Sequence, residues 1–98
     1  MRIIALGTLR QFWLKHPDSK EQLVVWYKNF SKSSYLNPNQ IREVYRSADN
    51  VGNGRIVFNI CRNEYRLIVK FNYKFQFGYI RFIGTHKEYD KITDIKNI

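Results

Sequence analysis

The chain has few of the residues that metal and redox sites require. Cys61 is the only cysteine among 98 residues, so neither an intrachain disulfide nor a thiolate metal cluster can form. The two histidines, His16 and His86, are far apart and match no metal-binding motif. Gly52-Asn53-Gly54 lacks the Lys-Ser/Thr pair that follows the glycines of a nucleotide-binding loop. We therefore expect neither a metal ion nor another cofactor.

Long apolar runs are also absent. No stretch approaches the roughly 20 residues of a membrane span. The start, Met1-Arg2-Ile3-Ile4-Ala5, is too short for a secretory signal. These absences favour a cytoplasmic protein with no membrane partner. The length predicts a single domain over residues 1–98, with enough chain for one core.

Positive charge is what the chain has in excess. It carries 17 lysines and arginines against 8 acidic residues, a net charge of +9 at pH 7. Hydrophobic residues make up 44% and aromatics 16%, which is typical of a folding globule and not of a disordered chain. On so small a domain the charge favours a polyanionic partner, either a nucleic acid or an acidic protein.

Apolar residues at helical spacing predict two helices in the first third of the chain. The first covers residues 9–15, with Thr8 or Gly7 as its N-cap, and the second covers residues 20–32, with Ser19 as its N-cap. We expect the two helices to pack as an antiparallel hairpin. Their core residues would be Phe12, Trp13, Trp26 and Phe30.

Three shorter segments complete the first half. Residues 2–5 are apolar and predict a short strand. Asn37-Pro38 has the cap-then-proline order that opens helices, here a short one near residues 39–45 that would bury Ile41, Val44 and Tyr45. Residues 47–54 are rich in turn formers and predict a loop.

After Gly54 the apolar period changes to two, which predicts strands. One set of alternate residues is apolar and should face the helices. A third strand, about 77–84, would place Ile80 and Phe82 opposite Tyr79, Arg81 and Ile83. The other face is mixed, and we expect its cations to be free to contact a phosphate backbone. It carries Asn59, Arg66, Lys70, Tyr79 and Arg81.

The register of the first two strands follows from the alternation. Directly opposed residues share a face, so Asn59 must pair with Glu64 or Arg66. A turn of two or four residues around Cys61-Arg62 satisfies that parity. The predicted architecture is α+β, with the helical hairpin on one face of a three- to four-stranded antiparallel sheet. Residues after His86 would form a short final helix.

A basic sheet face suits the metal-free cutting of RNA, in which the 2′-hydroxyl attacks its own phosphate. Arginine neutralises charge on the phosphate oxygens through its bidentate fork. Histidine suits proton transfer because its pKa lies near neutrality, and a positioned lysine or tyrosine can replace it. The last predicted strand ends near residue 84. It is followed directly by Thr85-His86-Lys87-Glu88-Tyr89-Asp90, so these groups lie next to the basic strands.

These residues resemble a known family. The resemblance is carried by Asn59, Asn63-Glu64, Tyr65-Arg66-Leu67, Gly78-Tyr79-Ile80-Arg81 and the Thr85–Asp90 block, which are similar to the HigB toxins of the RelE superfamily. It implies a RelE-like fold and a ribosome-dependent endonuclease of mRNA that leaves a 2′,3′-cyclic phosphate without a metal. It also implies an antitoxin partner with a helix-turn-helix domain, similar to HigA, and contact with operator DNA only through that antitoxin.

The resemblance also implies the roles of single residues. Arg66 matches a strand arginine that clamps the scissile phosphate. His86 and Lys87 fall where the family has a basic residue beyond the last long strand, and Tyr89 or Asp90 falls near its C-terminal reactive group. General acid and general base stay open among these four. Asp90 has two further interpretations: it orients His86, or it caps the final helix, and we favour the cap slightly.

The remaining polar residues on this face are expected to hold RNA. Lys70 and Arg81 suit phosphate positioning better than chemistry. Arg62 and Asn59 complete the RNA-binding set, although Asn59 also has the plain role of holding turn geometry. The competing hypothesis is a toxin without catalysis, which binds RNA or holds a protein target such as a topoisomerase.

Overall fold

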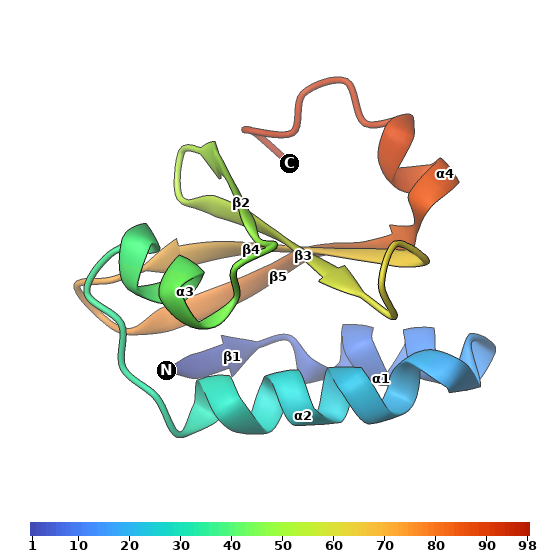
Figure 1. The fold of residues 1–98 in the computed structure, drawn as a ribbon, viewed down its shortest axis with the longest axis horizontal. Coiled ribbons are helices and arrows are strands. Elements are labelled where there is room, and N and C mark those ends of the chain that lie inside the picture. Colours follow the sequence, from blue (N-terminus) through green and yellow to red (C-terminus); the bar gives the residue numbers. More distant parts are fainter.

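The computed structural model describes all residues, 1–98, and contains one five-stranded sheet with the strand order β1-β5-β4-β3-β2 (Figure 1). In chain order the elements are β1 Arg2–Ile4, α1 Leu6–Lys15, a 3-10 turn Pro17–Ser19, α2 Lys20–Ser31, α3 Pro38–Val44, β2 Asp49–Gly52, β3 Arg55–Ile60, β4 Tyr65–Asn72, β5 Phe77–Thr85 and α4 His86–Asp90.

The helices divide between the two faces of the sheet. Helices α1 and α2 run below the sheet in Figure 1, where α1 packs against β5 and α2 against β1, whereas α4 and the C-terminal residues lie above it. This confirms the predicted α+β class and the helical hairpin. We call the two sides of the sheet the helix-covered face and the second face. No helix is long and apolar enough to cross a membrane.

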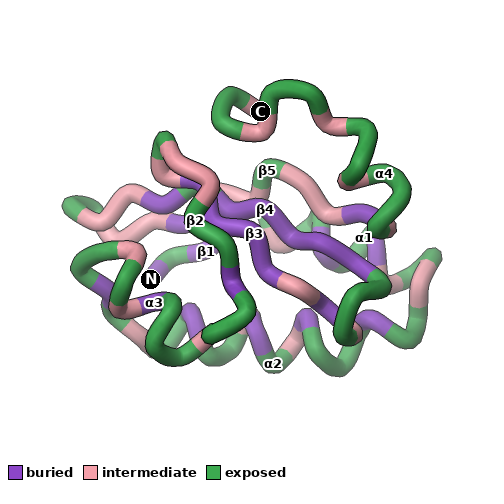
Figure 2. Tube along the Cα trace, turned by 45° about the horizontal axis from the view of Figure 1, so that its top comes forward, coloured by how far each residue is buried: buried purple, intermediate pink, exposed green.

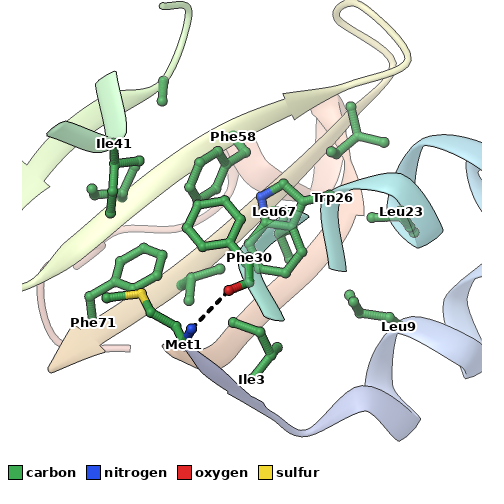
Figure 3. Close-up of a cluster of buried hydrophobic side chains, with 14 of the residues drawn as sticks. Met1, Ile3, Leu9, Leu23, Trp26, Phe30, Ile41, Phe58, Leu67 and Phe71 are labelled. Carbon is green, nitrogen blue, oxygen red and sulfur yellow. Dashed lines mark hydrogen bonds between the residues drawn. The ribbon is translucent and has the colours of Figure 1, made fainter. Parts of the chain in front are cut away.

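The core fills the space between α2 and the helix-covered face (Figure 3). Phe30 of α2 is fully buried, and its ring centroid lies 4.6 Å from that of Trp26 and 5.5 Å from those of Phe58 and Phe71. The N-terminal amine of Met1 donates to the Phe30 carbonyl at 2.9 Å, which joins the start of β1 to α2. The alternation predicted these contributions from β3 and β4 correctly. The residues of β3 and β4 in the core cluster are Ile56, Phe58, Ile60, Tyr65, Leu67, Val69 and Phe71.

The register of β3 and β4 is the predicted one. Asn59 lies opposite Arg66, and a four-residue turn joins Ile60 to Tyr65. The two paired strands, β3 and β4, are buried along most of their length (Figure 2). Arg66 and Lys70 therefore lie on the second face, as expected.

Two details of the predicted sheet were wrong, its three to four strands and its uniformly antiparallel pairing. Strand β1 pairs in parallel with β5, with Ile3 opposite Gly78. Residues 47–54 are not only a loop, because Asp49–Gly52 pairs with β3 as an edge strand. Its polar, glycine-containing sequence hides the strand, and the register shift between Asn50 and Gly52 marks an irregular edge.

A bulge in β5 places two residues on the opposite faces from those predicted. Ile68 lies opposite Phe82, whereas the next residue, Val69, lies opposite Ile80, so Arg81 is the extra residue. The bulge shifts the alternation by one. Phe82 therefore shares the second face with Arg66, and Ile83 packs against the core, the reverse of the expectation.

The predicted helix ends were partly wrong. Helix α1 begins at Leu6 with Ala5 as N-cap and no capping side chain, so neither Thr8 nor Gly7 opens it. Ser19 is the N-cap residue of α2, as predicted, but its hydroxyl donates to the His16 carbonyl at 2.7 Å and makes no capping hydrogen bond. Asn37 does cap α3, accepting from the Gln40 N–H at 3.0 Å. Within α3, Ile41 is buried as expected, but Val44 is 63% exposed.

Candidate functional site

A cleft of about 580 Å³ lies between the β3–β4 turn and the start of α4. The two walls are joined by a backbone hydrogen bond in which the His86 N–H donates to the Glu64 carbonyl at 3.1 Å. Two of the predicted catalytic residues, His86 and Lys87, and one predicted RNA contact, Arg62, line this cleft. Its full lining is Cys61, Arg62, Asn63, Glu64, Thr85, His86 and Lys87.

The turn that forms one wall is held in an unusual backbone conformation. Cys61 and Arg62 have φ values of 51° and 62°, in the left-handed region that side chains other than glycine rarely adopt. The Cys61 N–H donates to the Gln22 side chain of α2 at 2.7 Å, and the Cys61 thiol donates to the Asp18 carbonyl. These contacts with the helical layer stabilise a turn that would otherwise relax. Cleft shape and helix packing are therefore coupled.

The other wall starts with a capping box that the sequence analysis missed. Thr85 accepts from the Glu88 N–H at 3.2 Å, and the Glu88 carboxylate accepts from the Thr85 N–H at 2.8 Å. These hydrogen bonds from Thr85 lower the pKa of Glu88. The signal was present, because Thr85-His86-Lys87-Glu88 has the Ser/Thr-x-x-Glu pattern that opens helices. The box fixes the residue at which α4 begins, and hence where His86 and Lys87 point.

The His86 imidazole contacts the Asp90 carboxylate on α4. The His86 Nδ1 and Asp90 Oδ2 atoms are 2.9 Å apart, one helical turn from each other, with both side chains about half exposed. The interpretation that we favoured for Asp90, as a helix cap, was wrong, because Thr85 caps α4 and Asp90 lies at its other end. A carboxylate at Nδ1 holds the imidazole in one orientation and leaves Nε2 available for proton transfer.

Arg66 is less open than expected. Only 9% of its surface is exposed, and its Nη1 donates to the carbonyls of Asn63 and Tyr65 at 3.1 and 3.2 Å. Its guanidinium carbon lies 5.7 Å from the centroid of the Tyr89 ring. The expectation that it stands free was wrong. The strand holds it rigidly beside the cleft, and Nε and Nη2 make no hydrogen bond within the chain.

Tyr89 joins α4 to the second face. Its ring lies 6.5 Å from the Phe82 ring and covers Arg66. Burial raises the pKa of the Tyr89 phenol, and the neighbouring Arg66 charge lowers it by less. The phenol is therefore protonated at neutral pH. Four predicted catalytic residues thus occur as two contact pairs, Arg66 with Tyr89 and His86 with Asp90.

The remaining predicted RNA contacts lie outside the cleft. Lys70 is exposed on the second face, further along β4, and Arg81 donates through Nε to a main-chain oxygen of Ile98 at 2.9 Å. Asn59 lies opposite Arg66 but lines a different groove, of about 470 Å³, together with α2. The cleft and these residues do not form one continuous pocket. No three His, Cys, Asp or Glu side chains gather where they could hold a metal ion.

Comparison with known proteins gives a family. The model of a family described as HigB_toxin, the RelE-like toxic component of a toxin-antitoxin system, matches residues 19–92. The chain is 32% identical over 97 residues to the mRNA interferase toxin HigB of Escherichia coli K12, covering 97% of this chain and 93% of that protein. The same identity and coverage relate it to an mRNA interferase HigB of Shigella flexneri. A HigB of Escherichia coli O6:H1 is 25% identical over 95 residues.

Proposed function

This chain belongs to the HigB toxin family, and on that premise we propose that it is the toxin of a type II toxin-antitoxin system, an endoribonuclease that cuts mRNA. The observation that carries the proposal is the cleft beside α4. In the cleft and beside it, the fold gathers a rigid arginine from β4 with an oriented imidazole, a lysine and a protonated phenol from α4. These are the groups that metal-free RNA cleavage uses.

The nucleophile of the proposed reaction comes from the RNA itself. The 2′-oxygen forms a bond to the adjacent phosphorus while the bond from phosphorus to the 5′-oxygen breaks. One protein group takes the proton of the 2′-hydroxyl, and another gives a proton to the leaving 5′-oxygen. The products are a 2′,3′-cyclic phosphate and a 5′-hydroxyl. His86, held by Asp90, suits one of the two proton transfers.

The other residues act on the phosphate in this proposal. Arg66 neutralises charge on its nonbridging oxygens, and the N–H groups that make no hydrogen bond within the chain are available for that contact. Tyr89 fixes the plane of the guanidinium and offers its phenol proton. Lys87 and Arg62 line the cleft as further cations. Lys70, Arg81 and Asn59 position the flanking RNA.

We propose that cutting occurs on translating ribosomes in the cytoplasm. The cleft is shallow and mostly polar, so it has no deep pocket to grip a free RNA. The net charge of +9 supports docking on ribosomal RNA. The partner proposed for neutralisation is an antitoxin with a helix-turn-helix domain, similar to HigA, which would also make the only contact with operator DNA.

Mapping the 5′ ends of mRNA after brief expression tests the proposal. The wild-type chain should produce new 5′-hydroxyl ends within coding regions, together with growth arrest. His86→Ala should remove both, since losing a positioned proton-transfer group costs about 10²–10⁴ in rate. Lys28→Gln, on the exposed side of α2, is the matched control and should keep both. Growth arrest without new ends would instead indicate a toxin that binds its target without cutting.

A further inference from the structure

Two aromatic side chains lie next to each other on the second face, at the end of β5 that follows the β4–β5 turn. Phe77 lies opposite Asn72 of β4 and Tyr79 lies opposite Lys70, and directly opposed residues share a face of the sheet. The two ring centroids are 6.0 Å apart, with an angle of 43° between the ring planes. Gly78 between them faces the core, since a Cβ there would meet core side chains at 2.9 to 3.2 Å. We call Phe77 and Tyr79 the aromatic pair.

The aromatic pair does not belong to the hydrophobic core. Neither ring is part of the core cluster or of the partly buried side chains packed against it. Both rings are partly exposed, and α4 lies at the opposite end of β5 (Figure 1). Phenylalanine and tyrosine carry large apolar surfaces, which a small domain normally buries. Two such rings in contact outside the core therefore indicate a surface for a flat, apolar group of a ligand.

Cations flank the aromatic pair on both sides. Arg2 of β1 lies opposite Phe77, at the edge of the sheet, and Lys70 of β4 lies opposite Tyr79, towards its centre. Both cationic side chains are exposed. Flat rings beside cations fit a ligand in which planar apolar groups alternate with negative charges, and unpaired RNA has this chemistry. An acidic peptide would pair with the cations but has no regular series of planar groups for the rings.

We infer that the aromatic pair stacks unpaired bases of the mRNA next to the cutting site, and that Arg2 and Lys70 hold phosphates of the same segment. The inference rests on the proposed action on RNA. Lys70 lies four residues from Arg66 along β4, about 13 Å at strand spacing. The stacked bases therefore lie outside the cleft, and the aromatic pair positions the message without taking part in the chemistry. Stacking uses the ring faces, which every base offers, so we expect little base preference here.

The fluorescence of a short 2′-O-methyl oligoribonucleotide that contains 2-aminopurine tests this site on the full chain. The probe lacks the attacking 2′-hydroxyl and is not cut, and 2-aminopurine loses fluorescence when it stacks on an aromatic ring. The titration is made at low salt, where weak binding through phosphates is strongest. The wild-type chain should bind the probe and quench it with 2-aminopurine in at least one position of the oligonucleotide.

The ring of Tyr79 should carry the stacking. Tyr79→Ala should lower the affinity roughly ten-fold and reduce the quenching at saturation. It should leave the slope of log K against log salt unchanged, because no phosphate contact is lost. Tyr79→Phe keeps the ring and should keep both the affinity and the quenching.

Lys70→Gln should show the reverse pattern. The affinity should fall, and the slope of log K against log salt should decrease by about 0.7, the value for one lost phosphate contact with a single strand. The quenching at saturation should stay like that of the wild type, since both rings remain. Lys28→Gln removes the same charge from the exposed side of α2 and should change none of these quantities.

Phe75→Ala is the matched control for the aromatic substitution. Phe75 is 61% exposed, more than either ring of the aromatic pair, but it lies in the β4–β5 turn and not in a strand. Its loss should leave the affinity and the quenching unchanged, which separates stacking at the aromatic pair from contact with any exposed ring. The melting temperature of each variant shows that it is folded at the temperature of the titration.

Four results would overturn the inference: no binding by the wild-type chain at low salt, equal affinities of Tyr79→Ala and Phe75→Ala, a loss in Tyr79→Phe as large as in Tyr79→Ala, or an unchanged salt slope in Lys70→Gln. A purely structural role of the aromatic pair would lower the melting temperature of Tyr79→Ala and leave the affinity of the folded chain unchanged. Loss of antitoxin binding by Tyr79→Ala with unchanged RNA affinity would assign this surface to a protein partner and contradict the inference.

Failure here is distinguishable from failure of the proposed function. A chain that cuts mRNA but binds the probe equally well as Tyr79→Ala contradicts the inference alone. A chain that binds as expected but cuts no mRNA contradicts the function alone.

Discussion

Neighbouring residues of β4 lie on opposite faces of the sheet, and the two faces have different surroundings. On the helix-covered face, Leu67 is fully buried in a cluster that contains no charged side chain. On the second face, Ile68 is also fully buried, but its neighbours along the strand are Arg66 and Lys70. Helix α4 and the C-terminal residues lie on that side (Figure 1). One strand therefore provides both the stability of the fold and the proposed chemistry, on opposite faces.

The largest expected effect is a difference in the free energy of unfolding between substitutions on the two faces. Leu67→Ala should lower the free energy of unfolding by about 2–5 kcal/mol, because the well-packed core cannot close around the cavity. Ile68→Ala should cost an amount at the low end of that range, since the short C-terminal segment can move inward. Urea unfolding of both variants measures the difference. Equal costs would mean that the second face is packed as rigidly as the core.

The next effect concerns activity on the second face. Arg66→Lys keeps the charge but loses the planar fork and the stacking on Tyr89. We expect mRNA cutting to fall by about 10²-fold, while Leu67→Ala cuts at the wild-type rate below its melting temperature. Both rates are measured against Lys28→Gln. A fully active Arg66→Lys variant would show that Arg66 has only a structural role.

The sequence predicted which residues lie on each face of the sheet correctly in some strands and wrongly in others. The alternation in β3 and β4 placed the residues of the core cluster on the helix-covered face, and Arg66 and Lys70 on the second face, because period two and the turn parity determine the face. It failed in β5, where the bulge at Arg81 exchanges Phe82 and Ile83. It also missed β2, since edge strands need no apolar pattern. Local sequence carries no signal for either feature.

The site was predictable in its members but not in its contacts. The Thr85–Asp90 block contains the three residues of one cleft wall, Thr85, His86 and Lys87. The pairing of Asp90 with His86 and the covering of Arg66 by Tyr89 depend on where α4 docks, which long-range packing decides.

A smaller effect is expected at the start of α4. Thr85→Ala removes the N-cap and should cost about 1 kcal/mol. That loss lowers the melting temperature by roughly 4–8 °C for a domain of this size. It should also slow cutting, because His86 and Lys87 follow the cap directly. Thermal unfolding and a cutting assay on the same sample test both parts. Normal activity with the lower melting temperature would show that α4 docks without its cap.

The smallest effect depends on pH. The folded-state pKa of Glu88 is lowered by Thr85, so the stability it contributes is present above the unfolded-state pKa and is lost as pH falls through the folded-state value. Glu88→Gln should therefore be less stable than the wild type at pH 7, by less than about 1 kcal/mol because the group is exposed. The difference should narrow as the pH falls below the ordinary glutamate pKa. Melting temperatures of both chains between pH 7 and pH 3 measure it, and a constant difference would contradict the assignment.

The central claim is that mRNA is cut at the cleft between the β3–β4 turn and α4. Its most direct test is the rate of mRNA cutting on translating ribosomes in a purified system, with the wild-type chain, the Arg66→Ala/His86→Ala double variant and Lys28→Gln. All three must show a cooperative unfolding transition. The wild type and Lys28→Gln should cut at similar rates and leave 5′-hydroxyl ends, and the double variant should leave the message intact. Full cutting by a folded double variant would contradict the account.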